Sequence, residues 1–253
     1  EPAATDGADT AERTTFTVGF DAEYPPYGFK NDAGEYVGFD LDLAQEVCDR
    51  NGWELIKQPI DWSSKDMELN SGTVDCLWNG FTMTGRESEY TFSEPYVDNS
   101  IVFVVRQDSD IQTKEDLAGK IVITQAGSSA LTALTNTEDN DENLALAATF
   151  ASLEQTPDYN SAFMSLETGA VDAIAVDIGV AQYQLTNHSD KFRQLEEPLS
   201  TEQYAIAFKL GNEELRDQVQ ATLDEMVADG TFDAIAANYA DYNLDQMVCL
   251  GKE

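Results

Sequence analysis

Short apolar runs with the composition of β-strands alternate along this 253-residue chain with segments of helical periodicity. The strand-like runs lie at residues 15–20, 54–60, 74–78, 101–105, 121–124, 171–176 and 204–208. Helices are predicted at 40–51, 65–70, 113–119, 212–229 and 232–239, and one more begins near Ala130. Helical crossovers between strands favour parallel pairing, so the sequence predicts an α/β fold with a mostly parallel sheet.

Turn and cap residues refine the N-terminal part of this pattern. Asn31 to Gly34 predict a hairpin turn, and Asp40 is the predicted N-cap of the helix that follows. That helix is expected to end at Asn51-Gly52, because glycine commonly follows the last helical residue.

The chain is strongly acidic, with 48 Asp and Glu against 14 Lys and Arg and a net charge of −34. Nucleic-acid affinity depends on cations that neutralise phosphates, so this charge excludes DNA and RNA as expected partners. A hydrophobic content of 42% still indicates a folded protein, and the length suits one large or two ordinary domains.

No window approaches the roughly 18 apolar residues of a membrane span, and the first residues given lack the basic and apolar regions that are typical of a signal peptide. Residues 1–14 are small, polar and acidic, so we expect a flexible tether left after processing or trimming. Cys48, Cys76 and Cys249 lack the spacing of a zinc site; one pair could form a disulfide, or the thiols could be free and buried. We expect no metal.

The stretch from Asn79 to Arg86 predicts a small-anion site. A strand-like run ends there in Gly80, Thr82, Thr84 and Arg86, so amide, hydroxyl and guanidinium donors gather where a strand stops. Arginine can hold a carboxylate through two parallel hydrogen bonds. A turn with a surface arginine is the alternative.

A second group of small residues, at 125–129 (Gln-Ala-Gly-Ser-Ser), lies between a strand and a helix. Exposed N–H groups at the beginning of a helix favour anions. The chain therefore offers two candidate anion-binding segments, about fifty residues apart.

Four blocks of residues, in order, resemble the polar amino-acid solute-binding proteins of ABC importers, the bacterial extracellular solute-binding protein family 3. The blocks comprise residues 18–27, residues 38–43, residues 62–96, and residues 125–129 with 169–172 and Asp177. The resemblance extends over about residues 15–240, nearly the whole chain.

This resemblance implies a type II periplasmic binding protein, with two Rossmann-like α/β lobes that have mixed sheets and a two-strand hinge. The crossings are expected near 96–100 and 200–204, with lobe 1 at 15–98 plus 203–253 and lobe 2 at 99–202. The implied partners are a free amino acid, held between the lobes, and the membrane subunits of the importer. A monomer without cofactor is expected, outside the cytoplasm, either periplasmic or as a cell-surface lipoprotein.

The resemblance also assigns roles in binding the amino-acid head group. Arg86 would pair with the ligand α-carboxylate, helped by the Thr82 hydroxyl or N–H and by the Ser129 N–H. The Asp177 carboxylate and the Gly80 carbonyl would hold the α-ammonium.

The ligand side chain is expected to lie against the rings of Tyr24 and Trp62, with Asp21 and Asn79 in the same pocket. Asp21 would recognise a distal cationic group, so an arginine or lysine ligand is favoured, and glutamine, histidine and cystine remain open. Phe81 and Ser128, within the matching blocks, complete the predicted binding set.

One position departs from the family pattern. The family commonly has Pro-Glu between the second threonine and the arginine, whereas here Gly85 alone separates Thr84 from Arg86. Glycine can adopt the positive φ that a tightened turn needs.

Two other functions compete with solute binding. A secreted dehydratase or lyase needs an acid or base near the working pH, but the single histidine, His188, lies in a polar stretch expected at the surface. No nucleophile motif is present, so we expect no enzyme. A receptor's ligand-sensing domain would need an attached membrane or signalling segment, which these residues do not contain.

Overall fold

The computed structural model describes residues 13–136 and 141–252. Most of the predicted tether at 1–14 lies outside these residues. Arg13, near its end, forms an ion pair with Asp75 at 2.9 Å.

The first sheet has five strands in the order β5-β1-β6-β14-β7. Strand β1 pairs in parallel with β5 and β6, whereas β14 is antiparallel to β6 and β7, so the sheet is mixed. Its strands are β1 (Thr15–Phe20), β5 (Glu54–Pro59), β6 (Cys76–Leu77), β7 (Tyr90–Phe92) and β14 (Ala207–Lys209).

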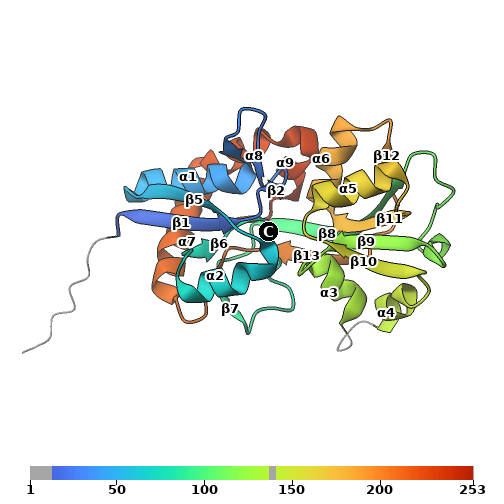
Figure 1. Ribbon diagram of the computed structural model, residues 1–253. Coiled ribbons are helices and arrows are strands. Elements are labelled where there is room, and N and C mark those ends of the chain that lie inside the picture. The colour runs from blue at the N-terminus through green and yellow to red at the C-terminus, as the bar shows by residue number, and fades with distance from the viewer. Residues whose placement is uncertain (1–12, 137–140, 253) are drawn as a thin grey trace, which may run out of the picture.

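Helices from both ends of the chain surround this sheet (Figure 1). They are α1 (Phe39–Asn51), α2 (Lys65–Ser71), α7 (Glu213–Asp229), α8 (Thr231–Ala237) and α9 (Leu244–Met247), with 3₁₀ turns η1 (Trp62–Ser64) and η3 (Ala240–Tyr242). A small antiparallel sheet consists of β2 (Glu23–Tyr24), β3 (Gly28–Lys30) and β4 (Tyr36–Val37). The turn between β3 and β4 confirms the predicted hairpin at 31–34.

The second sheet has the order β10-β9-β11-β8-β12, and β13 also pairs with β8. Its strands are β8 (Val97–Arg106), β9 (Ile121–Gln125), β10 (Ser152–Thr156), β11 (Ala173–Asp177), β12 (Phe192–Gln194) and β13 (Ser200–Tyr204). The associated helices are α3 (Ser129–Thr135), α4 (Asp141–Ala147), α5 (Tyr159–Thr168) and α6 (Ile178–Asn187), with the 3₁₀ turn η2 (Glu115–Leu117). The two sheets with their helices form two lobes, side by side in Figure 1.

Two strands connect the lobes. Strand β8 leaves lobe 1 and β13 returns to it, and the two are antiparallel, with Val97 opposite Tyr204 and Ile101 opposite Ser200. The predicted crossings near 96–100 and 200–204 coincide with this pair. The lobe boundaries themselves stay a prediction.

The C-terminal segment lies against the connecting strands. Val248 forms an isolated β-bridge with Val97, and the Cys249 N–H donates to the Tyr96 carbonyl at 3.0 Å. Figure 1 accordingly marks the C-terminus near the middle of the molecule. Residues from both ends of the chain therefore build lobe 1.

The amphipathic pattern of α7 places its apolar face in the core. Leu215, Val219, Leu223 and Met226 are all buried, as the helical periodicity predicts. The predicted stripe of α1 is buried in the same cluster.

Asp40 is not the helix cap that the sequence predicts. Gly38 occupies the cap position with φ +138°, because a Cβ there would lie 2.2 Å from the Tyr27 carbonyl oxygen. Asp40 lies in the first turn, fully buried, where its Oδ2 accepts from the Gly80 N–H at 2.6 Å and the Tyr96 hydroxyl at 2.9 Å. Burial raises the pKa of Asp40 to about 7, and these two bonds oppose the rise.

Several other local predictions differ from the structure. The helix predicted at 113–119 is only the short turn η2, whose three residues end at Leu117. The strand predicted at 204–208 is divided between β13 and β14, because the chain passes from one sheet to the other at Ala205 and Ile206. The helix predicted at 232–239 is α8, which ends at Ala237 and is followed by η3 and α9.

All three cysteines are free in the structure. Cys48 and Cys76 are buried, as one alternative predicts, and Cys249 is half-buried. Among the described residues, no helix combines the length and apolar character that a membrane crossing requires.

Candidate functional site

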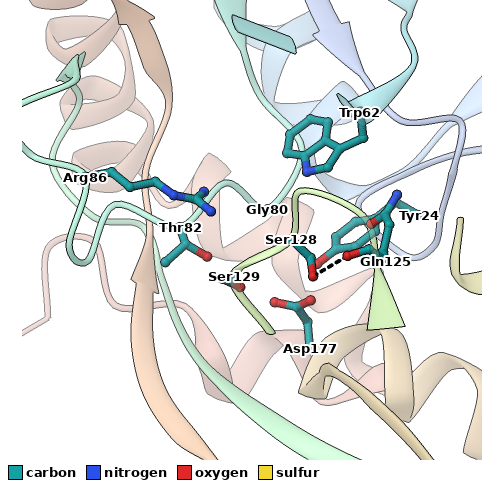
Figure 2. A pocket seen from close by; sticks show the side chains of 9 residues that line it. All are labelled: Tyr24, Trp62, Gly80, Thr82, Arg86, Gln125, Ser128, Ser129 and Asp177. Atoms are coloured by element: carbon teal, nitrogen blue, oxygen red, sulfur yellow. Dashed lines mark hydrogen bonds between the residues drawn. The ribbon is translucent and has the colours of Figure 1, made fainter. Parts of the chain in front are cut away.

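A narrow pocket lies between the lobes. Figure 2 shows side chains from both lobes pointing into it. Lobe 1 contributes Tyr24, Trp62, Gly80, Thr82 and Arg86, and lobe 2 contributes Gln125, Ser128, Ser129 and Asp177. The structure thus brings eight of the predicted residues together, with Gln125 as an unpredicted ninth.

Arg86 is held at the pocket by a tight turn. Its N–H donates to the Met83 carbonyl at 2.9 Å, and Gly85 has φ +80°, the positive value predicted for this shortened segment. The guanidinium lies 4.9 Å from the centroid of the Phe81 ring. No carboxylate in the described part of this very acidic chain forms an ion pair with Arg86. Its two-pronged donor surface is therefore available to another anion.

Phe81 supports the pocket from behind. Its ring packs against those of Trp62, Tyr90 and Phe92, with centroids 5.6, 5.1 and 5.9 Å away. Phe81 is thus a core residue beneath Arg86 and Trp62, and it does not line the pocket.

Asp177 faces the pocket from the other lobe, across from Arg86 in Figure 2. It lies at the end of β11 and precedes α6, but its side chain does not cap that helix. Instead its Oδ1 accepts from the Tyr204 hydroxyl at 2.5 Å and from the Asn99 Nδ2 at 2.8 Å. Burial raises the pKa of Asp177, and these hydrogen bonds oppose the rise.

Gly80 is confined by aromatic rings. It has φ +57°, and a Cβ at this position would lie 2.8 Å from a Tyr204 ring carbon and 3.2 Å from one of Tyr24. The hydroxyls of those two tyrosines are hydrogen-bonded to each other at 3.2 Å. The backbone therefore reaches the pocket only because residue 80 has no side chain.

Glu202, on β13, is an acidic residue near the site that the sequence analysis missed. Its Oε1 accepts from Thr82 Oγ1 at 2.6 Å, from Asn99 Nδ2 at 2.8 Å and from Ser129 Oγ at 3.0 Å. Asn99 is directly opposite Glu202 in the β8–β13 register. The sequence signal that could have identified Glu202 is the presence of polar side chains at facing positions of the two predicted crossings.

Asp21 and Asn79 lie behind the pocket wall. The Asp21 Oδ2 accepts from the Gln125 Nε2 at 2.6 Å, and its Oδ1 accepts from the Glu23 N–H at 2.9 Å. Burial raises the pKa of Asp21 to about 6. Asn79 is buried, and its Oδ1 has no hydrogen-bond partner and lies 2.8 Å from where a Cβ on Gly28 would be.

Further contacts hold the two lobes together around the pocket. Lys65 Nζ donates to the Gly127 carbonyl at 3.3 Å and lies 5.5 Å from the centroid of the Trp62 ring. The Asn160 amide donates to the Glu23 carboxylate. With the bond between Asp21 and Gln125, these contacts join the two lobes beside the pocket.

The described residues contain no group of three or more His, Cys, Asp or Glu side chains suited to a metal ion. His188, at the end of α6, is half-buried and does not line the pocket.

Residues 16–242 match the model of the family described as bacterial extracellular solute-binding proteins, family 3. The chain belongs to this family. Its membership confirms the resemblance found in the sequence, and with it the expectation of a non-enzymatic protein.

Solved structures of similar proteins confirm the predicted type II fold. Tv2483 bound to L-arginine gives a TM-score of 0.85 at 28% identity and covers 94% of each chain. An ABC uptake transporter substrate-binding protein from Streptococcus pneumoniae with bound histidine gives 0.82 at 31% identity, covering 89% of this chain and 92% of its own. By sequence, the L-cystine-binding protein TcyJ of Escherichia coli (strain K12) is 29% identical over 231 residues, 90% of this chain and 83% of its own.

Two glycine substitutions test the confinement of Gly80. Gly80→Ala is expected to lower the melting temperature more than Gly85→Ala, because both require an unfavourable positive φ but only the first meets aromatic rings. The backbone cost is about 1–3 kcal/mol in either variant. Calorimetry of the unliganded variants makes the comparison, and equal losses would contradict the steric role of the two tyrosines.

Proposed function

We propose that this protein captures a polar amino acid between its lobes, outside the cytoplasm, and delivers it to the membrane subunits of an ABC importer. The observation that carries the proposal is the pair of opposite charges across the pocket. Arg86 has no carboxylate partner among the described residues, and Asp177, on the other lobe, forms no ion pair with a described cation. An amino-acid head group carries the two complementary charges.

The hydrogen bonds around the pocket indicate which backbone and side-chain groups are free to bind the ligand carboxylate and ammonium. The Thr82 hydroxyl donates to Glu202, so of the two predicted donors on this residue we assign its backbone N–H to the ligand carboxylate. The Ser129 hydroxyl also donates to Glu202, so we assign the Ser129 N–H, as predicted, to the ligand carboxylate. The Gly80 carbonyl is the proposed second acceptor for the ammonium, beside Asp177.

Buried negative charge behind the pocket favours a cationic side chain. The rings of Tyr24 and Trp62 line the pocket, and Gln125 separates it from Asp21. A guanidinium or ammonium group that displaces the Gln125 amide would reach the Asp21 carboxylate, whose raised pKa reflects uncompensated burial. Arginine is also the ligand of Tv2483, the structural relative with a TM-score of 0.85. We therefore propose arginine or lysine as the ligand.

The family description and the relatives support the cellular setting. The family comprises extracellular solute-binding proteins, and the Streptococcus pneumoniae relative belongs to an ABC uptake transporter. We propose that the protein acts as a monomer, either as a cell-surface lipoprotein or in the periplasm.

A thermal-shift panel of the common amino acids, ornithine, cystine and several keto acids tests the proposal. At 100 times its dissociation constant the ligand adds roughly 2.7 kcal/mol, which raises the melting temperature of a protein of this size by roughly 5–10 °C. Arginine or lysine is expected to give the largest shift. A larger shift with glutamine, histidine or cystine would replace the cationic assignment, and no shift with any amino acid would reject the capture function.

Arg86→Ala is expected to weaken the binding of every amino-acid ligand by at least about 30-fold, because removing one partner of a hydrogen-bonded charge pair enclosed on ligand binding costs roughly 2–5 kcal/mol. Arg86→Lys keeps the charge but loses the planar fork, so its loss is expected to be smaller. Isothermal titration calorimetry measures both, with the unliganded melting temperature as the control for folding. Unchanged affinity in the alanine variant would refute the role of Arg86.

Asp21→Asn is expected to weaken arginine and lysine binding by about tenfold, or about 1.4 kcal/mol, with a smaller effect on any neutral amino acid that binds. Asparagine can still accept the Gln125 hydrogen bond, so the interlobe contact is kept. Asp32→Asn, at an exposed turn position, is the control for the same change in net charge. An equal loss of affinity for cationic and neutral ligands would show that Asp21 does not recognise the ligand side chain.

A further inference from the structure

Glu202 is fixed by donors from three parts of the molecule. Thr82 belongs to lobe 1, Ser129 to lobe 2 and Asn99 to the connecting strand β8, and all three donate to the same oxygen, Oε1. No described group donates to Oε2. Oε1 therefore accepts all three hydrogen bonds, while Oε2 can carry a proton when the carboxyl group is neutral.

Glu202 and Asp177 form a pair of acids around one amide, with Asp177 buried and Glu202 half-buried. The Asn99 Nδ2 donates to the Glu202 Oε1 and to the Asp177 Oδ1, at 2.8 Å in each case. Neither acid forms an ion pair with a lysine or arginine in the described ranges 13–136 and 141–252. Two negative charges so placed disfavour each other.

A second hollow reaches Glu202 from the hinge side. It is lined by residues of both connecting strands and of the loop beside them, namely Thr84, Asp98, Asn99, Ser100, Thr201, Glu202 and Gln203. Glu202 does not line the ligand pocket, which is lined by its partners Thr82 and Ser129. The residue therefore lies between the ligand pocket and the hinge hollow.

We propose that Glu202 is a positioning residue that couples amino-acid capture to the release of a proton on the hinge side. The inference rests on the proposed function, because the α-ammonium at Asp177 is the charge that drives the release. When that cation binds, it stabilises the ionised form of the acid pair, and the O–H bond of protonated Glu202 gives its proton to water in the hinge hollow. The O–H bond on Glu202 breaks and an O–H bond on the accepting water forms.

The charges around Glu202 support this coupling. Burial, followed by the charge of Asp177, raises the pKa of Glu202 to about 7, and its three hydrogen bonds oppose the rise. Four tyrosine phenols lie near the acid pair, and their raised pKa values keep them neutral; they belong to Tyr24, Tyr27, Tyr159 and Tyr204. Asp98 is a further titratable group, in the hinge hollow. The ligand α-carboxylate, which is proposed to bind near Thr82 and Ser129, would act on Glu202 in the opposite direction, but Arg86, which also lines the pocket, offsets its charge.

The sign of the pH dependence follows. A bound cation lowers the pKa of Glu202 from about 7, so affinity falls as the pH drops below 7 and levels off above it. Between pH 8 and pH 6 this contribution reaches about tenfold in the dissociation constant. A cationic ligand side chain at Asp21 would act in the same direction, because it favours the ionised form of that buried carboxyl group and so lowers its pKa. The contribution of Glu202 is therefore measured as a difference between variants.

Glu202→Gln tests the proposal, because its amide oxygen can still accept the three hydrogen bonds but the residue cannot ionise. Glu54→Gln, exposed on β5, is the control for the same change in charge. Calorimetric titration at pH 7, in two buffers of different ionisation enthalpy, counts the protons released. The unmodified protein and Glu54→Gln are expected to release about half a proton more than Glu202→Gln. Their affinities are expected to fall about tenfold more between pH 8 and pH 6.

Equal proton release and equal pH profiles in all three proteins would overturn the inference, even if every one binds amino acids. If Glu202→Gln does not fold, Glu202→Asp keeps an ionisable group, and proton release with a shifted midpoint supports the coupling. Absence of proton release near pH 7 in both the unmodified protein and Glu202→Asp would reject it. Failure of the unmodified protein to bind any amino acid would instead reject the proposed function.

Discussion

The antiparallel pairing of β8 with β13 is the interaction on which the site depends. It connects the lobes and sets Asn99 opposite Glu202. Strand β11 joins β8 on its other side, with Asp177 opposite Ile101, two residues along from Asn99. Both acids therefore come within reach of one amide because of strand register alone. A shift of one residue in either pairing would turn Asn99 to the opposite face and separate the two acids.

The site also depends on how charge is distributed in a very acidic protein. The excess of acidic side chains offers a cation many partners, yet Arg86 is kept from the described carboxylates by a turn that directs it over Phe81. On the other wall, Asp177 is held by neutral hydroxyl and amide donors. Neutral donors hold a carboxylate in place without cancelling its charge, so the field across the pocket is maintained for a ligand.

Much of this arrangement could be predicted from the sequence, since local patterns specify strands, helix faces and the matching blocks. Arg86, Thr82 and Ser129 follow strand ends, where chain order alone places them near the pocket. Glu202 could not be predicted in this way, because its contact with Asn99 depends on register between residues 103 positions apart. Asp40 was misassigned for a related reason: its burial against Gly80 and Tyr96 overrides the usual role of an aspartate at a helix start.

The position of β14 has a consequence for how the chain assembles. Strands β8 to β13 are contiguous in the sequence, so the second sheet can form as soon as residue 204 has emerged from the ribosome. The first sheet cannot, because β14 lies between β6 and β7 and must arrive before β7 can join. Vectorial synthesis therefore completes lobe 2 before lobe 1, and the N-terminal half of the pocket acquires its final support only when β14 has docked.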